Sequence, residues 1–222
     1  MKCVICHDEW MPKMSFSMLL TLQQPDVCCS RCRSRFVLID GHVCDRCGRP
    51  TEQNVCSDCM MWQQRGSALI NNRSLYVYND WMKEVINRFK FRGDYALIEA
   101  FRHEVCAFFY KHFSSDMFLV PIPLSSSRLV ERGFNQAEAI ASLLSLPMIF
   151  ALRRIDDKKQ SKKTRRERFI GGKFCLTNED VAGKRIVIID DIYTTGATVH
   201  EAAQLLYDAG AREIYSFTLV RS

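Results

Sequence analysis

Two adjacent carboxylates and a hydroxyl-rich loop are the clearest chemical signal in the sequence. Residues 186–198 read IVIIDDIYTTGAT, in which branched apolar residues precede Asp190 and Asp191 and a short polar stretch follows. Successive main-chain N–H groups at the start of a helix bind phosphate, and carboxylates beside them accept hydrogen bonds from vicinal hydroxyls. The run therefore predicts a site for a ribose 5-phosphate. The phosphate contacts that we expect in the loop are Thr194, Thr195, Gly196, Ala197 and Thr198.

Cysteines are a second signal, because nine of the 11 lie within the first 59 residues, most of them in four C-x-x-C pairs. Eight thiolates match two Zn(Cys)4 sites, which are closed and structural. Sequential pairing, a cross-braced arrangement and a single site with free pairs are all compatible with the spacing. Cys28 is a spare that could replace Cys29. The expected zinc ligands are Cys3, Cys6, Cys29, Cys32, Cys44, Cys47, Cys56 and Cys59.

The net charge of +6 is concentrated in residues 151–170, which hold nine basic and three acidic residues. Such a segment indicates a polyanionic partner, either nucleic acid or a phosphorylated small molecule, although a solvated loop has the same composition. The expected DNA contacts are Lys162, Lys163, Arg165, Arg166 and Arg168. The apolar run at 16–22 is far shorter than the roughly 20 residues of a membrane span, so we expect a cytoplasmic protein.

The elements that must position these residues alternate between strand and helix from Phe118 onward, which predicts a parallel sheet flanked by helices. Strands are expected at 74–78, 118–124, 147–152, 184–189 and 213–220, and helices at 80–92, 135–146 and 197–209. The carboxyl ends of parallel strands are where ligands bind. We divide the chain into a zinc-binding module, residues 1–66, and an α/β domain, residues 67–222. No internal repeat is visible.

Residues 186–198 resemble the signature with which type I phosphoribosyltransferases bind phosphoribosyl pyrophosphate (PRPP). The resemblance implies their fold, Mg²⁺ bound with PRPP, and a pyrophosphate loop at 120–128 that includes Ser125 and Arg128. It also implies a mobile basic loop, which residues 153–168 match in position. Tyr193 would either lie near the ribose or pack against neighbouring side chains.

The order of the motifs resembles the ComF family over the whole chain. The four C-x-x-C pairs are followed by FKFRGD at 89–94, ERGFNQ at 131–136 and then the PRPP signature. The resemblance implies family-specific contacts from Arg132, Asn135 and Gln136, with Gly133 permitting a tight turn, although a loop and helix cap without a ligand has the same residues. In FKFRGD the phenylalanines would be core, and Lys90 and Arg92 solvated.

The ComF resemblance implies a competence protein that assists uptake of transforming single-stranded DNA, acts with the helicase-like ATPase ComFA and is recruited to the membrane-associated uptake machinery. The zinc module would then dock partners. The alternative is an active Mg²⁺-dependent phosphoribosyltransferase whose acceptor the sequence does not identify.

Overall fold

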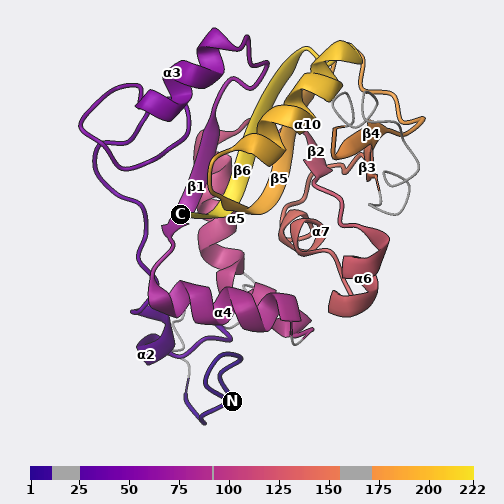
Figure 1. Cartoon of the computed structure of the whole chain (residues 1–222). Coiled ribbons are helices and arrows are strands. Elements are labelled where there is room, and N and C mark those ends of the chain that lie inside the picture. The colour runs from indigo at the N-terminus through magenta and orange to yellow at the C-terminus, as the bar shows by residue number, and fades with distance from the viewer. Residues whose placement is uncertain (12–25, 92, 156–171) are drawn as a thin grey trace.

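A four-stranded parallel sheet forms the centre of the computed structural model, which describes residues 1–11, 26–91, 93–155 and 172–222 (Figure 1). Its strands lie in the order β1-β6-β5-β2. Their bounds are β1 Asn72–Val77, β2 Phe118–Pro121, β5 Arg185–Tyr193 and β6 Glu213–Arg221. The architecture confirms the expected α/β class with a parallel sheet.

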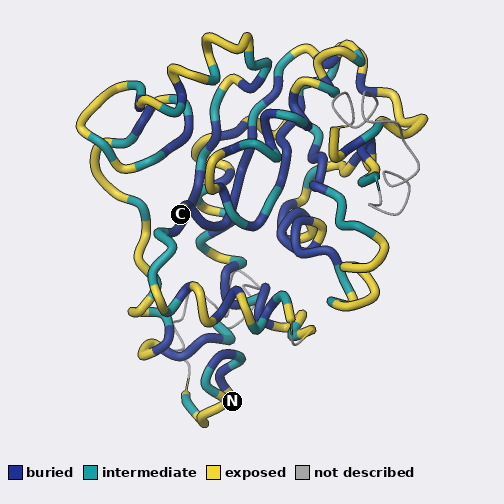
Figure 2. Tube along the Cα trace, in the orientation of Figure 1, coloured by how far each residue is buried: buried dark blue, intermediate teal, exposed yellow. Residues whose placement is uncertain are grey.

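The sheet is the main part of the hydrophobic core. The four branched residues 186–189 of β5 are fully buried, as a strand covered on both faces requires. Figure 2 shows the same burial along the neighbouring strands. This apolar run ends at Ile189, but the strand continues through both aspartates, because Asp190, Ile192 and Tyr193 still pair with β6. The carboxylates therefore stand at the carboxyl edge of the sheet.

Helices cover both faces of the sheet. From β1 the chain passes through α4 (Asp80–Phe91), a 3₁₀ helix η1 (Tyr95–Phe101) and α5 (Arg102–His112) before it enters β2. From β5 it passes through α10 (Ala197–Asp208) to β6. These two crossovers run in opposite directions along the sheet, so right-handed connections place α5 and α10 on opposite faces (Figure 1).

Between β2 and β5 lie α6 (Ser126–Arg132), α7 (Gln136–Ala141) and an antiparallel pair, β3 (Leu152–Arg154) and β4 (Phe174–Leu176). The strand expected at 147–152 is wrong for most of its length. Only Met148 forms a parallel bridge, to Leu119, before the chain turns away into β3. The helix expected to reach residue 146 ends at Ala141, where the Ser142 hydroxyl donates to the Ala139 carbonyl at 2.7 Å.

The cysteines form two units with the same backbone plan. The first cysteine unit joins a turn at Cys3–Cys6 to α2 (Ser30–Arg33), and the second joins a turn at Cys44–Cys47 to α3 (Ser57–Gln64). In each unit the cysteine just before the helix donates its amide to the sulfur that begins the turn, at 3.3 Å. The structure thus contains a repeat that is not visible in the sequence, because the two units share little beyond their cysteines.

The two units dock at different places. The first contacts α4 and α5, where Arg88 donates to the carbonyl of Ile5 and Arg33 pairs with Glu104. The second contacts the start of β1, where Asn72 donates to the carbonyl of Cys47, and the loop after β5, where Trp62 donates to the carbonyl of Thr195. Between them, Leu38 bridges to Tyr76 and covers the outer edge of β1. The domain boundary at residue 66 stays a prediction. None of the helices in the described ranges is long and apolar enough to cross a membrane.

Candidate functional site

A cleft of about 260 Å³ opens where β2 and β5 end. A second hollow of about 140 Å³ lies inside the phosphate loop, residues 194–198. A single water needs only about 10–15 Å³, so both spaces have room for a larger ligand. The cleft is lined by two carboxylates and four cationic side chains: Asp190, Asp191, Lys90, Arg128, Arg132 and Arg154. The inner hollow adds Lys173.

The phosphate loop presents main-chain amides to the inner hollow. Within the described part of the chain, the N–H groups of Thr194, Thr195 and Gly196 have no acceptor. Gly196 has φ +80°, and a Cβ there would lie 2.2 Å from the Tyr193 hydroxyl oxygen. Glycine is thus required by both the conformation and the space. The arrangement suits an anion at the start of α10.

The two aspartates have different surroundings. Asp190 accepts from the Asp191 amide at 2.9 Å, and burial together with the neighbouring Asp191 charge raises its pKa. Asp191 pairs with the ammonium of Lys90 at 2.5 Å, and both side chains are largely buried. The expectation of a solvated Lys90 is wrong, because the inner face of α4 carries this residue into the cleft. Sequence reasoning left Lys90 and Lys173 out of the candidate site, and included Arg154 only as part of the implied basic loop 153–168. Arg92 lies outside the described residues.

Segment 125–136 supplies both caps and charge. Ser125 caps α6 by accepting from the Arg128 amide, and Gly133 ends that helix in the left-handed conformation. Asn135 caps α7 and donates to the carbonyl of Ile122 at 3.0 Å. Gln136 accepts from Arg132 at 2.9 Å.

These bonds make Asn135 and Gln136 internal supports of the cleft wall, and leave Arg132 facing the cleft. Its Nε has no partner among the described residues, and burial lowers the pKa of its guanidinium. Tyr193 packs inward instead of toward the cleft, with its hydroxyl 3.2 Å from Nε2 of His200.

Each cysteine unit gathers four sulfurs that fit a tetrahedral metal ion. Within each set all sulfurs lie within 4.8 Å of one another. A zinc ion with bonds of about 2.3 Å separates its sulfurs by about 3.8 Å. The Cys6–Cys29 and Cys47–Cys56 sulfurs are 3.8 and 3.7 Å apart. Both sets can therefore hold a metal such as zinc.

The grouping corresponds to the sequential pairing of the C-x-x-C pairs and leaves one buried cysteine over. Cys29 belongs to the first set, whereas Cys28 donates to the carbonyl of Cys29 at 3.6 Å. Burial raises the pKa of Cys28 to about 12, so it stays a neutral thiol near neutral pH. Cys28 is therefore not one of the four cysteines that can hold the metal in the first unit.

The DNA contacts expected at Lys162, Lys163, Arg165, Arg166 and Arg168 lie outside the described residues. The cleft and the phosphate loop, both within the described ranges, are candidate sites for an anion. They adjoin, since Asp190, Ile192, Thr194 and Thr198 line both.

Comparison with known proteins gives matches over part and over all of the chain. The family model described as the phosphoribosyl transferase domain matches residues 129–222. Competence protein ComFC of Bacillus subtilis (strain 168) is 43% identical over 227 residues, covering 99% of this chain and 95% of that protein. ComFC of Streptococcus pneumoniae (strain ATCC BAA-255 / R6) is 35% identical over the full length of both chains. DNA utilization protein YhgH of Escherichia coli (strain K12) is 26% identical, covering 87% of this chain and 90% of that protein.

Proposed function

This chain belongs to the ComFC family of competence proteins, and we propose that it assists uptake of transforming single-stranded DNA by binding phosphorylated sugar in the cleft. The observation that carries the proposal is that two carboxylates, which can accept hydrogen bonds from a diol, lie next to the phosphate loop, whose main-chain amides can bind an anion. Asp190 and Asp191 stand at one side of the cleft, and the free amides of the phosphate loop lie beside them.

The charge of the cleft supports a polyanionic ligand. Four cations face two carboxylates, and one of those carboxylates is already neutralised by Lys90. The walls therefore carry an excess of positive charge, which attracts phosphate groups. Binding to these walls would also release the counterions that surround a polyanion, and this release favours binding. A 5-phosphorylated ribose would place its phosphate at the loop and its hydroxyls at the aspartates.

Exposed aromatic rings next to the cleft support the nucleic-acid part of the proposal. The expectation of a core Phe91 is wrong, because its side chain is 58% exposed; Tyr95 is 47% exposed. The Arg132 guanidinium lies 5.4 Å from the centre of the Phe91 ring. Unstacked bases bind to such rings and to guanidinium planes. Single-stranded DNA could thus place a phosphate in the cleft and a base against Phe91.

The first experiment is a calorimetric titration of the zinc-loaded protein with PRPP in the presence of Mg²⁺. We expect saturable binding that disappears in the Asp190→Asn/Asp191→Asn double variant, because each amide loses the negative charge and one of the two acceptor oxygens of the carboxylate. Asp116→Asn is a matched control, since Asp116 pairs with Arg185 away from the cleft. No binding by the unmodified protein would refute the sugar-phosphate proposal.

A second experiment separates DNA binding from sugar-phosphate binding. Phe91→Ala should weaken binding of a single-stranded oligonucleotide roughly 5- to 150-fold, from the loss of one base stack. PRPP binding should change little. Tyr207 is 56% exposed on α10, and Tyr207→Ala is the control. Equal DNA affinities of the two variants would contradict a stacking role for Phe91.

The second candidate function is catalysis, namely transfer of the phosphoribosyl group with Mg²⁺ to an acceptor. The retained aspartate pair favours it, because two adjacent carboxylates at a sugar-phosphate site are also suited to a developing positive charge on the ribose. Pyrophosphate release from PRPP with nucleobase, amine or DNA acceptors tests it. Release that persists in the double aspartate variant would argue against catalysis in this cleft.

The finer parts of the DNA-uptake role rest on the family. We propose that zinc fills both cysteine units, that one unit contributes to docking of the ATPase ComFA, and that this interaction brings the protein to the membrane-associated uptake machinery. Residues 162–168 would add sequence-independent phosphate contacts. Neutralising Lys162, Lys163, Arg165 and Arg166 together should then reduce both DNA affinity and its dependence on salt.

A further inference from the structure

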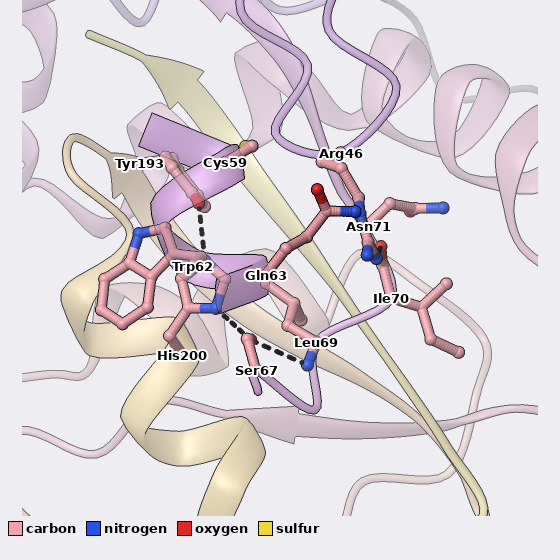
Figure 3. Close-up of a pocket in the computed structure, with 10 residues that line it drawn as sticks. All are labelled: Arg46, Cys59, Trp62, Gln63, Ser67, Leu69, Ile70, Asn71, Tyr193 and His200. Carbon is pink, nitrogen blue, oxygen red and sulfur yellow. Dashed lines mark hydrogen bonds between the residues drawn. The ribbon is translucent and has the colours of Figure 1, made fainter. Parts of the chain in front are cut away.

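The second cysteine unit is in direct contact with the back of the phosphate loop. Trp62 of α3 stacks on His200 of α10, with ring centres 4.0 Å apart and planes 13° from parallel (Figure 3). The indole N–H donates to the carbonyl of Thr195 at 3.1 Å. His200 is itself held between Ser67 and Tyr193. The space left among these side chains is about 20 Å³, enough for about one water molecule, so this is a packed interface and not a ligand pocket.

Arg221 makes a second connection between the unit and the loop. Its Nη1 donates to the carbonyls of Tyr193 at 3.0 Å and Thr194 at 2.9 Å. Its Nη2 lies 3.9 Å from the sulfur of Cys47. Arg221 is only 4% exposed. One buried guanidinium therefore joins a metal-ligating cysteine to the main chain of the loop.

These bonds, together with that from the Ser222 amide to the Tyr193 carbonyl at 3.0 Å, fix the direction in which the loop amides point. Trp62 and Arg221 together hold the carbonyls of residues 193, 194 and 195 on the side of the cysteine unit. In a planar trans peptide the C=O and the following N–H point in opposite directions. The amides of residues 194, 195 and 196 are thereby turned away from the unit, toward the inner hollow. Those are the amides that lack an acceptor in the described chain.

We propose that Arg221 and Trp62 are positioning residues through which the second cysteine unit holds the phosphate loop in its anion-binding conformation. Metal binding at this unit and anion binding at the loop are then coupled. The inference rests on the proposed binding of sugar phosphate and adds what regulates its affinity. The first cysteine unit, which docks on α4 and α5, makes none of the contacts that carry this coupling.

The charge of the unit explains why the metal matters to Arg221. A buried guanidinium needs a compensating negative charge, and four thiolates with one Zn²⁺ carry a net charge of −2. A bound metal would also fix the Cys44–Cys47 turn and α3, which carry Cys47 and Trp62. Loss of the metal would release both anchors of the loop. Because coupling of two binding events is reciprocal, a bound anion should also retain the metal.

The affinity test compares two arginines near the same cysteines. Arg221→Gln should weaken PRPP binding by about tenfold or more, since two hydrogen bonds from a charged donor are lost. Arg49 pairs with Asp58 beside the same unit without contacting the loop, so Arg49→Gln is the control. Trp62→Phe is a second variant that keeps the stack on His200 and removes the indole donor. Trp62→Phe should weaken PRPP binding several-fold, and this variant keeps the proposal testable if Arg221→Gln fails to fold.

The metal test measures release of zinc to a coloured chelator, with and without saturating PRPP. We expect PRPP to slow the release of one of the two zinc ions in the unmodified protein and in Arg49→Gln. In Arg221→Gln this protection should be reduced or lost. If Arg221 and Trp62 had merely structural roles, their substitution would lower the stability of the protein, but PRPP would still slow the release of zinc.

The outcomes distinguish the two proposals. If the zinc-loaded protein does not bind PRPP, the proposed function fails and this inference fails with it. If it binds PRPP but both zinc ions are released at unchanged rates, only the inference fails. The same holds if Arg221→Gln and Trp62→Phe fold and bind PRPP as tightly as the unmodified protein.

Discussion

Two glycines with the same backbone conformation should respond differently to a methyl group. Gly133 has φ +78° and Gly196 has φ +80°, so alanine at either position costs about 1–2 kcal/mol for the left-handed conformation alone. A Cβ at residue 133 would have no heavy atom within 4 Å. At residue 196 it would meet the Tyr193 hydroxyl oxygen at 2.2 Å, the Tyr193 Cζ at 2.5 Å and the His200 ring at 2.9 Å.

Relief of that overlap requires movement of buried groups. Tyr193 is 3% exposed, its hydroxyl contacts His200, and Arg221 lies over its ring. Forcing an extra carbon into such packing costs about 1–3 kcal/mol more. We therefore expect Gly133→Ala to lower the free energy of unfolding by about 1–2 kcal/mol and Gly196→Ala by about 2–5 kcal/mol.

Urea unfolding of both variants in zinc-containing buffer measures the difference. With a slope of about 2 kcal/mol per molar urea, the midpoints of the two variants should differ by roughly 0.5–1.5 M. In a Tyr193→Ala background the extra cost at Gly196 should become smaller, because the two closest overlaps are gone and only that with the His200 ring remains. Equal losses in the two single variants would refute the reasoning, and would mean that the loop adapts without moving Tyr193.

Three further predictions concern other parts of the molecule. Burial and the Asp191 charge raise the pKa of Asp190, so this carboxyl ionises only above the usual carboxylate range. PRPP affinity, measured by calorimetry, should therefore increase as the pH rises and Asp190 ionises. The same measurement on Asp190→Asn should show a weaker dependence on pH. Lys90→Ala leaves the Asp191 carboxylate unpaired and should lower the free energy of unfolding at neutral pH by about 1–3 kcal/mol, measured with urea. An unchanged urea midpoint would contradict the burial of this ion pair. Cys28→Ser should retain two zinc ions per chain by metal analysis, whereas Cys29→Ser should retain one; the reverse result would exchange the ligand assignments.

The parts of the site that the sequence predicts are those formed by neighbouring residues. The buried run before Asp190 indicates a strand, and the small polar residues after Asp191 indicate a helix start, so the carboxylates and the phosphate loop follow from local pattern. The C-x-x-C spacing similarly indicates the metal ligands, although only the folded chain shows which pairs share an ion.

The parts that could not be predicted are contacts between distant segments. Lys90 reaches Asp191 only because α4 packs beside the cleft, and nothing in the local pattern distinguishes it from a solvated lysine. Trp62 and Thr195 are 133 residues apart in sequence. A tryptophan within a cysteine-rich segment predicts burial, but its partner is decided by tertiary packing.

The strand order also has a consequence for how the chain folds. The central strand β6 joins β1 to β5, and it follows every other strand of the sheet in sequence. Side-chain bonds between β1 and β6, such as Ser216 to Asn72, span 144 residues. Until β6 has been synthesised, β2 and β5 can pair with each other, whereas β1 has no strand to join it to them. Closing so long a segment is entropically costly and slow.

The eight cysteines of the two units precede the whole sheet, so their thiolates can bind metal before the sheet closes. Arg221 belongs to β6 and reaches Cys47 only when that strand has docked. We therefore expect metal acquisition to come early and completion of the loop to come late during synthesis. Refolding experiments should then show a fast phase in which zinc is bound, followed by a slower phase in which the capacity to bind anions appears.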